Sequence, residues 1–94
     1  MGNILFVDDD SISLQLMTRA VALLGHEVIC DPSPRRALRR VVENPPVLIL
    51  VDLQMMEMSG IEFIRELRQL EVGRDIPALI YTASIEPYEL RQAL

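Results

Sequence analysis

The chain has no lysine, no tryptophan, one cysteine and no long apolar run. The single thiol, Cys30, excludes an internal disulfide and any paired-cysteine metal or redox motif. The apolar runs are far shorter than the roughly 20 residues that a membrane helix needs. Since half of the residues are hydrophobic, these absences leave an aliphatic core as the main source of stability.

Acidic residues outnumber basic ones by 14 to 9, which gives a net charge of −5, and all nine basic residues are arginine. No long basic run or aromatic platform offsets the repulsion from phosphate backbones, so we expect no direct nucleic-acid partner. The first residues show neither the basic segment nor the apolar stretch of a secretory signal. We therefore expect a cytoplasmic location and no membrane partner.

Two apolar runs, residues 4–7 and 47–51, lead directly into carboxylates. The first is followed by Asp8 and Asp9, and the second by Asp52. Continuous aliphatic runs of this length are typical of strands buried on both faces of a parallel sheet. Parallel strands end at the same edge, where open α/β sheets bind ligands. We therefore expect these carboxylates to converge if the two strands are neighbours.

Helices and strands alternate along the rest of the chain. We predict two further strands and four helices, at residues 27–30 and 78–82 and at residues 11–24, 34–43, 60–70 and from Pro87 onward. The hydroxyls of Ser11 or Ser13, Ser33 and Ser59 are expected to cap three helices, and Gly25 to end the first. This alternation requires right-handed crossovers and helices on both faces of the sheet. Residues 1–94 are thus interpreted as a single α/β domain.

Apolar spacing indicates which face each helix buries. In the first helix Ile12, Leu16, Met17, Ala20, Val21 and Leu24 recur at helical spacing. The second helix is expected to bury Ala37, Leu38, Val41 and Val42, and the third Ile61, Ile64 and Leu67. The other face of the second helix carries four arginines, at positions 35, 36, 39 and 40. We interpret this face as solvated, in preference to a docking surface.

The carboxylates at the sheet edge are suited to phosphoryl chemistry. Mg²⁺ usually takes one or two protein carboxylates and completes its shell with water and phosphate oxygens, and Asp8 or Asp9 with Asp52 fits this pattern. A carboxylate attacks phosphorus once a metal neutralises the charge on both groups. Thr82, at the end of the last predicted strand, is placed to donate a hydroxyl to the phosphoryl oxygens.

Four features together resemble a known family. They are the strand-end pair Asp8-Asp9, the segment Leu50–Gly60, the strand-end pair Thr82-Ala83, and the alternating βα order with similar spacings. On these features the chain resembles the receiver domain of two-component response regulators, a family that includes the chemotaxis regulator. The resemblance implies a flavodoxin-like, doubly wound parallel sheet with strand order 2-1-3-4. It implies a signalling domain that is not an enzyme beyond its own phosphorylation and dephosphorylation.

The resemblance also implies a role for each site residue. Asp52 is the phosphoacceptor, Asp9 the principal ligand of Mg²⁺ or Mn²⁺, Asp8 an acidic partner acting through water, Gln54 a ligand through its backbone carbonyl, Thr82 the phosphoryl-binding hydroxyl, and Ala83 the small residue that keeps access open. The implied phosphoryl donor is a partner histidine kinase or phosphotransfer protein. The phosphorylated state would switch contacts with an output domain or downstream protein.

The sequence departs from the family pattern in two places. Met56 stands where proline is usual, which is expected to loosen the loop after Asp52. The family's fifth strand, its strand-end lysine and its final helix are missing from these 94 residues. The strand at residues 78–82 is then an unpaired apolar edge, and we expect a dimer or domain swap through it. A truncated or degenerate receiver, acting as a non-phosphorylated interaction or dimerisation module, is therefore the alternative function.

Two other interpretations of the acidic residues stay open. In one, residues 8–10 merely cap a helix, where the helix dipole favours anions, and Asp52 starts a turn. In the other, Asp8 and Asp10 form the nucleophile motif of a haloacid dehalogenase-type phosphatase, although that class too is expected to need a lysine. For Asp10 alone, a solvent-facing or capping role is favoured over metal ligation. Tyr81 is interpreted either as a packing residue or as part of a signal relay.

Overall fold

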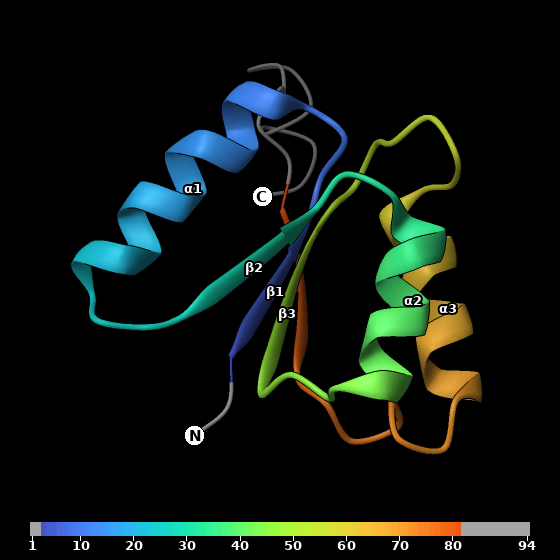
Figure 1. Cartoon of the computed structure of the whole chain (residues 1–94). Coiled ribbons are helices and arrows are strands. Elements are labelled where there is room, and N and C mark those ends of the chain that lie inside the picture. Colours follow the sequence, from blue (N-terminus) through green and yellow to red (C-terminus); the bar gives the residue numbers. More distant parts are fainter. Residues whose placement is uncertain (1–2, 82–94) are drawn as a thin grey trace, which may run out of the picture.

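The computed structural model of the chain describes residues 3–81, so the predictions for Thr82, Ala83 and the helix from Pro87 lie outside the described residues. Strands and helices alternate as predicted (Figure 1). In chain order they are β1 (Ile4–Val7), α1 (Ser11–Leu23), β2 (Val28–Asp31), α2 (Pro34–Glu43), β3 (Leu48–Asp52), α3 (Gly60–Gln69) and β4 (Ala78–Tyr81).

The four strands pair in parallel in the order β2-β1-β3-β4, which confirms the predicted strand order. Val7 at the end of β1 lies opposite Val51 in β3 and Asp31 in β2. The predicted bounds of β2, residues 27–30, were one residue too early, because the parallel register pairs Val28 with the first residue of β1. The register brings the ends of β1 and β3 together at one edge.

Helices cover both faces of the sheet, with α1 on one face and α2 and α3 on the other (Figure 1). The main core lies under α2 and α3, where residues from both helices and the inner strands are fully buried: Val7, Ala37, Val41, Ile49, Val51, Phe63 and Leu67. On the other face Phe6 is fully buried, but Ile12 and Leu16 of α1 are 65% and 63% exposed, although their spacing predicted them on the buried face of the helix. No described helix is long and apolar enough to span a bilayer.

The buried faces of α2 and α3 differ from the prediction. In α3, Phe63 is fully buried whereas Ile61, expected inside, is 48% exposed. Phe63 and Leu67 are four residues apart and share the face that begins at the buried Gly60, while Ile61 is turned away from it. In α2 the same geometry buries Ala37 and leaves Val42 exposed.

The helix ends follow the capping chemistry with one correction. The N-cap of α1 is Asp10, whose carboxylate accepts from the Ile12 N–H at 3.3 Å and from the Ser13 hydroxyl at 2.9 Å. The predicted serine cap was wrong because Ser11 is already helical. Ser33 and Ser59 cap α2 and α3 as predicted.

Candidate metal centre

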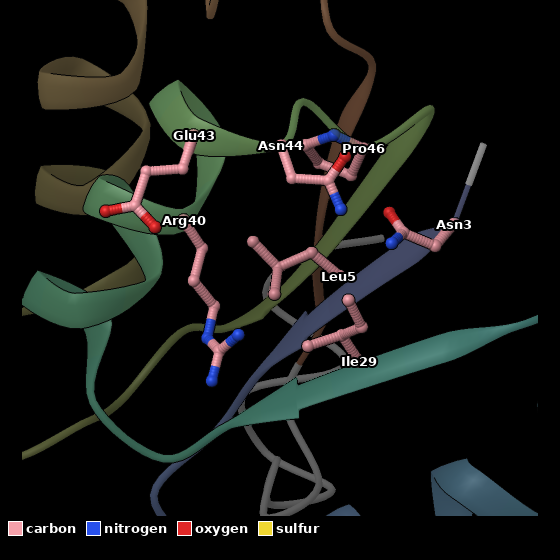
Figure 2. Close-up of a pocket in the computed structure, with 7 residues that line it drawn as sticks. All are labelled: Asn3, Leu5, Ile29, Arg40, Glu43, Asn44 and Pro46. Atoms are coloured by element: carbon pink, nitrogen blue, oxygen red, sulfur yellow. The ribbon is translucent and has the colours of Figure 1, made fainter.

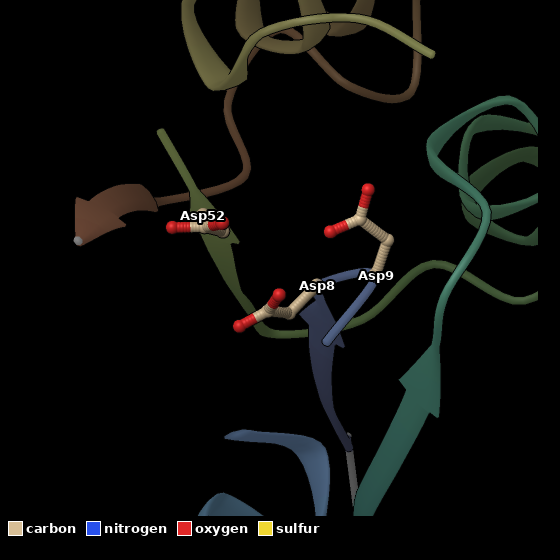
Figure 3. A group of neighbouring side chains, drawn as sticks. All are labelled: Asp8, Asp9 and Asp52. Atoms are coloured by element: carbon tan, nitrogen blue, oxygen red, sulfur yellow. The ribbon is translucent and has the colours of Figure 1, made fainter. Parts of the chain in front are cut away.

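Three carboxylates converge at the edge of the sheet where β1 and β3 end (Figure 3). One oxygen each from Asp8, Asp9 and Asp52 lies within 4.8 Å of the other two. Asp8 and Asp9 directly follow β1, and Asp52 is the last residue of β3, so the parallel pairing of these strands produces the convergence. Asp8 is almost completely buried, Asp52 is half-buried and Asp9 is exposed.

Asp8 is held by two hydrogen bonds from neutral donors. The Asp10 backbone N–H donates to its Oδ1 at 2.9 Å, and the Tyr81 hydroxyl donates to its Oδ2. Burial and the bond to Asp8 raise the pKa of Tyr81 far above its usual value, so the phenol keeps its proton. Both oxygens of this buried carboxylate are therefore satisfied without a cationic side chain.

Asp9 contacts the loop that follows β3. Its Oδ2 accepts a hydrogen bond from the Met56 backbone N–H at 2.7 Å. Proline, the usual residue at this position in the resembled pattern, has no N–H and could not make the bond. Met56 thus connects the loop to the carboxylate cluster through its backbone, and the loosening expected from its side chain stays a prediction.

Asp52 lies in the negative potential of its neighbours. Burial first, and then the charge of Asp8, raise the pKa of Asp52 above its ordinary value, although the backbone N–H groups of Gln54 and Leu53 act in the opposite direction. The ion pairs found within residues 3–81 join Arg35, Arg36 and Arg40 to Asp31 or Glu57, so none neutralises this cluster. The charge favours a cation among the three carboxylates.

The donor set fits Mg²⁺ or Mn²⁺. Carboxylate oxygens are the ligands that hard divalent cations prefer, and three of them approach one another here without a basic side chain. Asp10 is engaged in capping α1, so it does not join the cluster, whereas Asp8 and Asp9 have no capping role. The capping interpretation thus holds for Asp10 but not for Asp8 and Asp9.

The structure leaves the predicted roles of the other site residues untested. Gln54 is exposed in the loop after β3, and Thr82 and Ala83 lie outside the described residues. Sequence reasoning missed the donors on the carboxylates, the Met56 N–H and the Tyr81 hydroxyl. The available signal for Tyr81 was its position at the end of β4, directly opposite Asp52 in the sheet.

A separate ion cluster lies at the end of β2. The fully buried Asp31 accepts from Arg36 Nε at 3.0 Å, from Arg40 Nε at 2.7 Å and from the Ser33 N–H at 2.9 Å. Two of the four arginines interpreted as a solvated face thus bind the sheet. Burial alone raises the pKa of Asp31, but the bonds from Arg36, Ser33 and Arg40 outweigh it, and the pKa lies below its usual 3.8.

Replacing Asp31 tests this cluster. We expect Asp31→Asn to lower the free energy of unfolding at neutral pH by about 1.5–3 kcal/mol, because the charged hydrogen bonds from Arg36 and Arg40 weaken. Since the folded-state pKa is depressed, the carboxylate's contribution is present above the unfolded pKa and is lost as the pH falls through the folded pKa, below about 4. Denaturant unfolding at several pH values should therefore show a larger acid loss for wild type than for Asp31→Asn.

Glu57→Gln is the matched control for Asp31→Asn. It changes an exposed carboxylate whose Oε2 lies 3.9 Å from Arg35 Nε. We expect its stability to stay within about 1 kcal/mol of wild type. An acid profile of Asp31→Asn identical to that of wild type would contradict the role of the buried pair.

A small pocket lies at the opposite edge of the sheet (Figure 2). Its lining combines the start of β1 with the end of α2: Asn3, Leu5, Ile29, Arg40, Glu43, Asn44 and Pro46. Its volume of about 60 Å³ has room for a few water molecules. This pocket contains none of the three carboxylates Asp8, Asp9 and Asp52.

The fold and the site define an α/β protein with a cluster of three carboxylates at the carboxyl edge of a parallel sheet. The profile of the response regulator receiver domain matches residues 4–94. The chain belongs to this family, whose members act in two-component signal transduction. This confirms the resemblance drawn from the motifs.

Individual relatives agree with the assignment. The chain is 33% identical over 94 residues to the regulatory protein AtoC of Escherichia coli, and 33% identical over 81 residues to the polar-differentiation response regulator DivK of Brucella ovis. These matches cover 100% and 86% of this chain, but 20% of AtoC and 66% of DivK. The chemotaxis protein CheY4 of Vibrio cholerae superposes with a TM-score of 0.83 at 26% identity, over 99% of this chain and 78% of that one.

Proposed function

We propose that the chain accepts a phosphoryl group on Asp52 from a partner histidine kinase or phosphotransfer protein, in a reaction that depends on Mg²⁺ or Mn²⁺. The observation that carries the proposal is the approach of Asp8, Asp9 and Asp52 to within 4.8 Å at the end of two neighbouring strands. A nucleophilic carboxylate beside two further carboxylates has the composition of a cation-assisted acceptor.

Each residue has a proposed part. Asp9 is the main cation ligand, Asp8 acts through water, and Gln54 contributes its backbone carbonyl. When bound, the cation neutralises the charge on the acceptor and on the phosphoryl group. The Thr82 hydroxyl binds a phosphoryl oxygen, and the small Ala83 leaves the approach to it open. These last two roles rest on the family pattern alone.

The transfer is a displacement at phosphorus. An oxygen of Asp52 forms a bond to phosphorus as the bond to the donor's histidine nitrogen breaks, and the imidazole takes up a proton. Asp8 and Asp9 hold the cation in position, and Asp52 itself becomes phosphorylated. The chain therefore turns over no external substrate, and its only further reaction is the hydrolysis of its own phosphoryl group. Such a domain acts in the cytoplasm by switching its contacts with an output domain or downstream protein.

A second candidate function is a non-phosphorylated interaction module. It is favoured by the sheet edge at β4, where Leu79 and Ile80 are 58% and 41% exposed and residues 3–81 supply no further strand. Association through this edge, as a dimer or domain swap, is compatible with either function.

Labelling by a small phosphodonor separates the two functions. We expect acetyl phosphate to add one phosphoryl group to the chain in the presence of Mg²⁺, and none after chelation with EDTA, as measured by intact mass. Asp31→Asn is the control, because it removes a carboxylate that lies at the same sheet edge but outside the cluster. We expect this variant to gain the same mass from acetyl phosphate as wild type. If wild type gains no mass with Mg²⁺ present, the interaction module becomes the better description.

A further inference from the structure

The environment of Asp8 is unusual for a cation ligand. Its side chain is 1% exposed, and its two oxygens accept from the Asp10 N–H and from the Tyr81 hydroxyl. No cationic side chain within residues 3–81 pairs with it. Burying a carboxylate is costly unless each oxygen has a partner, so these two neutral donors stabilise Asp8 in the absence of a cation.

Packing fixes the position of the Tyr81 hydroxyl. Tyr81 is the last residue of β4 and lies opposite Asp52 in the register. Its ring packs against the ring of Phe6, with centroids 5.0 Å apart and planes tilted by 60°. Phe6 is fully buried in β1, two residues before Asp8, and both rings line a groove beside Leu16 of α1. The ring contact therefore aims the hydroxyl at Asp8.

We propose that Tyr81 is a positioning residue that satisfies Asp8 in the cation-free state and thereby lowers the affinity of the site for divalent cations. This inference rests on the proposed function, because it assumes that Asp8 helps to hold a cation. The phenol proton partly neutralises the carboxylate that would attract the cation. When a hydrated cation binds, the hydrogen bond from the Tyr81 hydroxyl to Asp8 has to weaken. This hydrogen bond therefore opposes cation binding.

The variant Tyr81→Phe removes the donor and keeps the ring that packs on Phe6. It leaves Asp8 Oδ2 without a partner in the cation-free protein and leaves its negative charge less compensated. Both effects favour binding of a cation. A hydrogen bond to a charged group is strong enough for the change in affinity to be about tenfold.

Calorimetric titration with Mg²⁺ tests the inference. We expect Tyr81→Phe to bind Mg²⁺ about tenfold more tightly than wild type, to unfold at a lower temperature without Mg²⁺, and to gain more thermal stability on adding it. The control Thr18→Val removes a hydroxyl that bonds the Leu14 carbonyl within α1, away from the carboxylate cluster, and should match wild type. Mg²⁺ should change the near-ultraviolet tyrosine absorption of wild type and of Thr18→Val, and this change should be smaller in Tyr81→Phe.

The outcomes separate this inference from the proposed function. If wild type binds Mg²⁺ and Tyr81→Phe binds it equally or more weakly, the role of Tyr81 is wrong while the cation site stands. If neither protein binds Mg²⁺, the cation site is wrong and the inference fails with it. Far-ultraviolet circular dichroism of Tyr81→Phe, compared with wild type and Thr18→Val, establishes that the variant remains folded.

Discussion

Phe63→Ala is expected to lower the free energy of unfolding by about 3–5 kcal/mol, as replacing a buried aromatic residue usually does. Phe63 is fully buried and belongs to the core that joins α3 to the sheet and to α2. The loss is a large fraction of the roughly 5–15 kcal/mol that stabilises a typical domain. Urea unfolding followed by circular dichroism measures it.

Ile61→Ala is the matched control, because it removes an aliphatic side chain from the same helix at a position that is half exposed. We expect it to cost less than about 1.5 kcal/mol, since little apolar surface is buried there. A larger loss for Ile61→Ala than for Phe63→Ala would mean that the helix presents the opposite face to the sheet.

Gly60→Ala is expected to slow phosphoryl labelling of Asp52 by about tenfold or more. A Cβ at this position would lie 2.5 Å from the Asp52 carbonyl oxygen and 3.1 Å from the Leu53 Cα, so the backbone that carries the acceptor has to move. Small displacements of reacting groups cost large factors in rate. Overpacking also costs about 1–3 kcal/mol of stability.

Gly25→Ala separates the effect on the site from the effect on stability. Gly25 has a φ of 81°, which strains any residue with a Cβ, but nothing lies within 4 Å of the added atom. We expect it to lose about 1 kcal/mol of stability and to be labelled at the wild-type rate. Equal labelling rates for the two variants would contradict the proposed contact between Gly60 and the acceptor loop.

The architecture was largely predictable from local patterns. The runs before Asp8 and Asp52 identified the central strands, and Ser33, Ser59 and Gly25 marked helix ends through capping chemistry that depends on nearby residues. The strand order followed from family resemblance. The buried face of α3 was harder to predict. Several apolar residues in this helix are compatible with more than one buried face, and only packing on the sheet determines which one is buried.

The site shows the same division. The meeting of Asp8, Asp9 and Asp52 was predictable, since it needs only parallel neighbours that end in carboxylates. The hydrogen bond from Tyr81 to Asp8 spans 73 positions, and that from Met56 to Asp9 spans 47. Such contacts depend on the register of the whole sheet and on loop geometry, so no local sequence pattern predicts them.

The most direct test of the central claim is to locate the phosphoryl group. After labelling with acetyl phosphate and Mg²⁺, borohydride reduction converts an acyl-phosphorylated aspartate to homoserine, which peptide mass spectrometry can place in the chain. The account predicts homoserine at position 52 in wild type and none in Asp52→Asn. Homoserine at position 8 or 10 in wild type, or labelling that survives in Asp52→Asn, would contradict it.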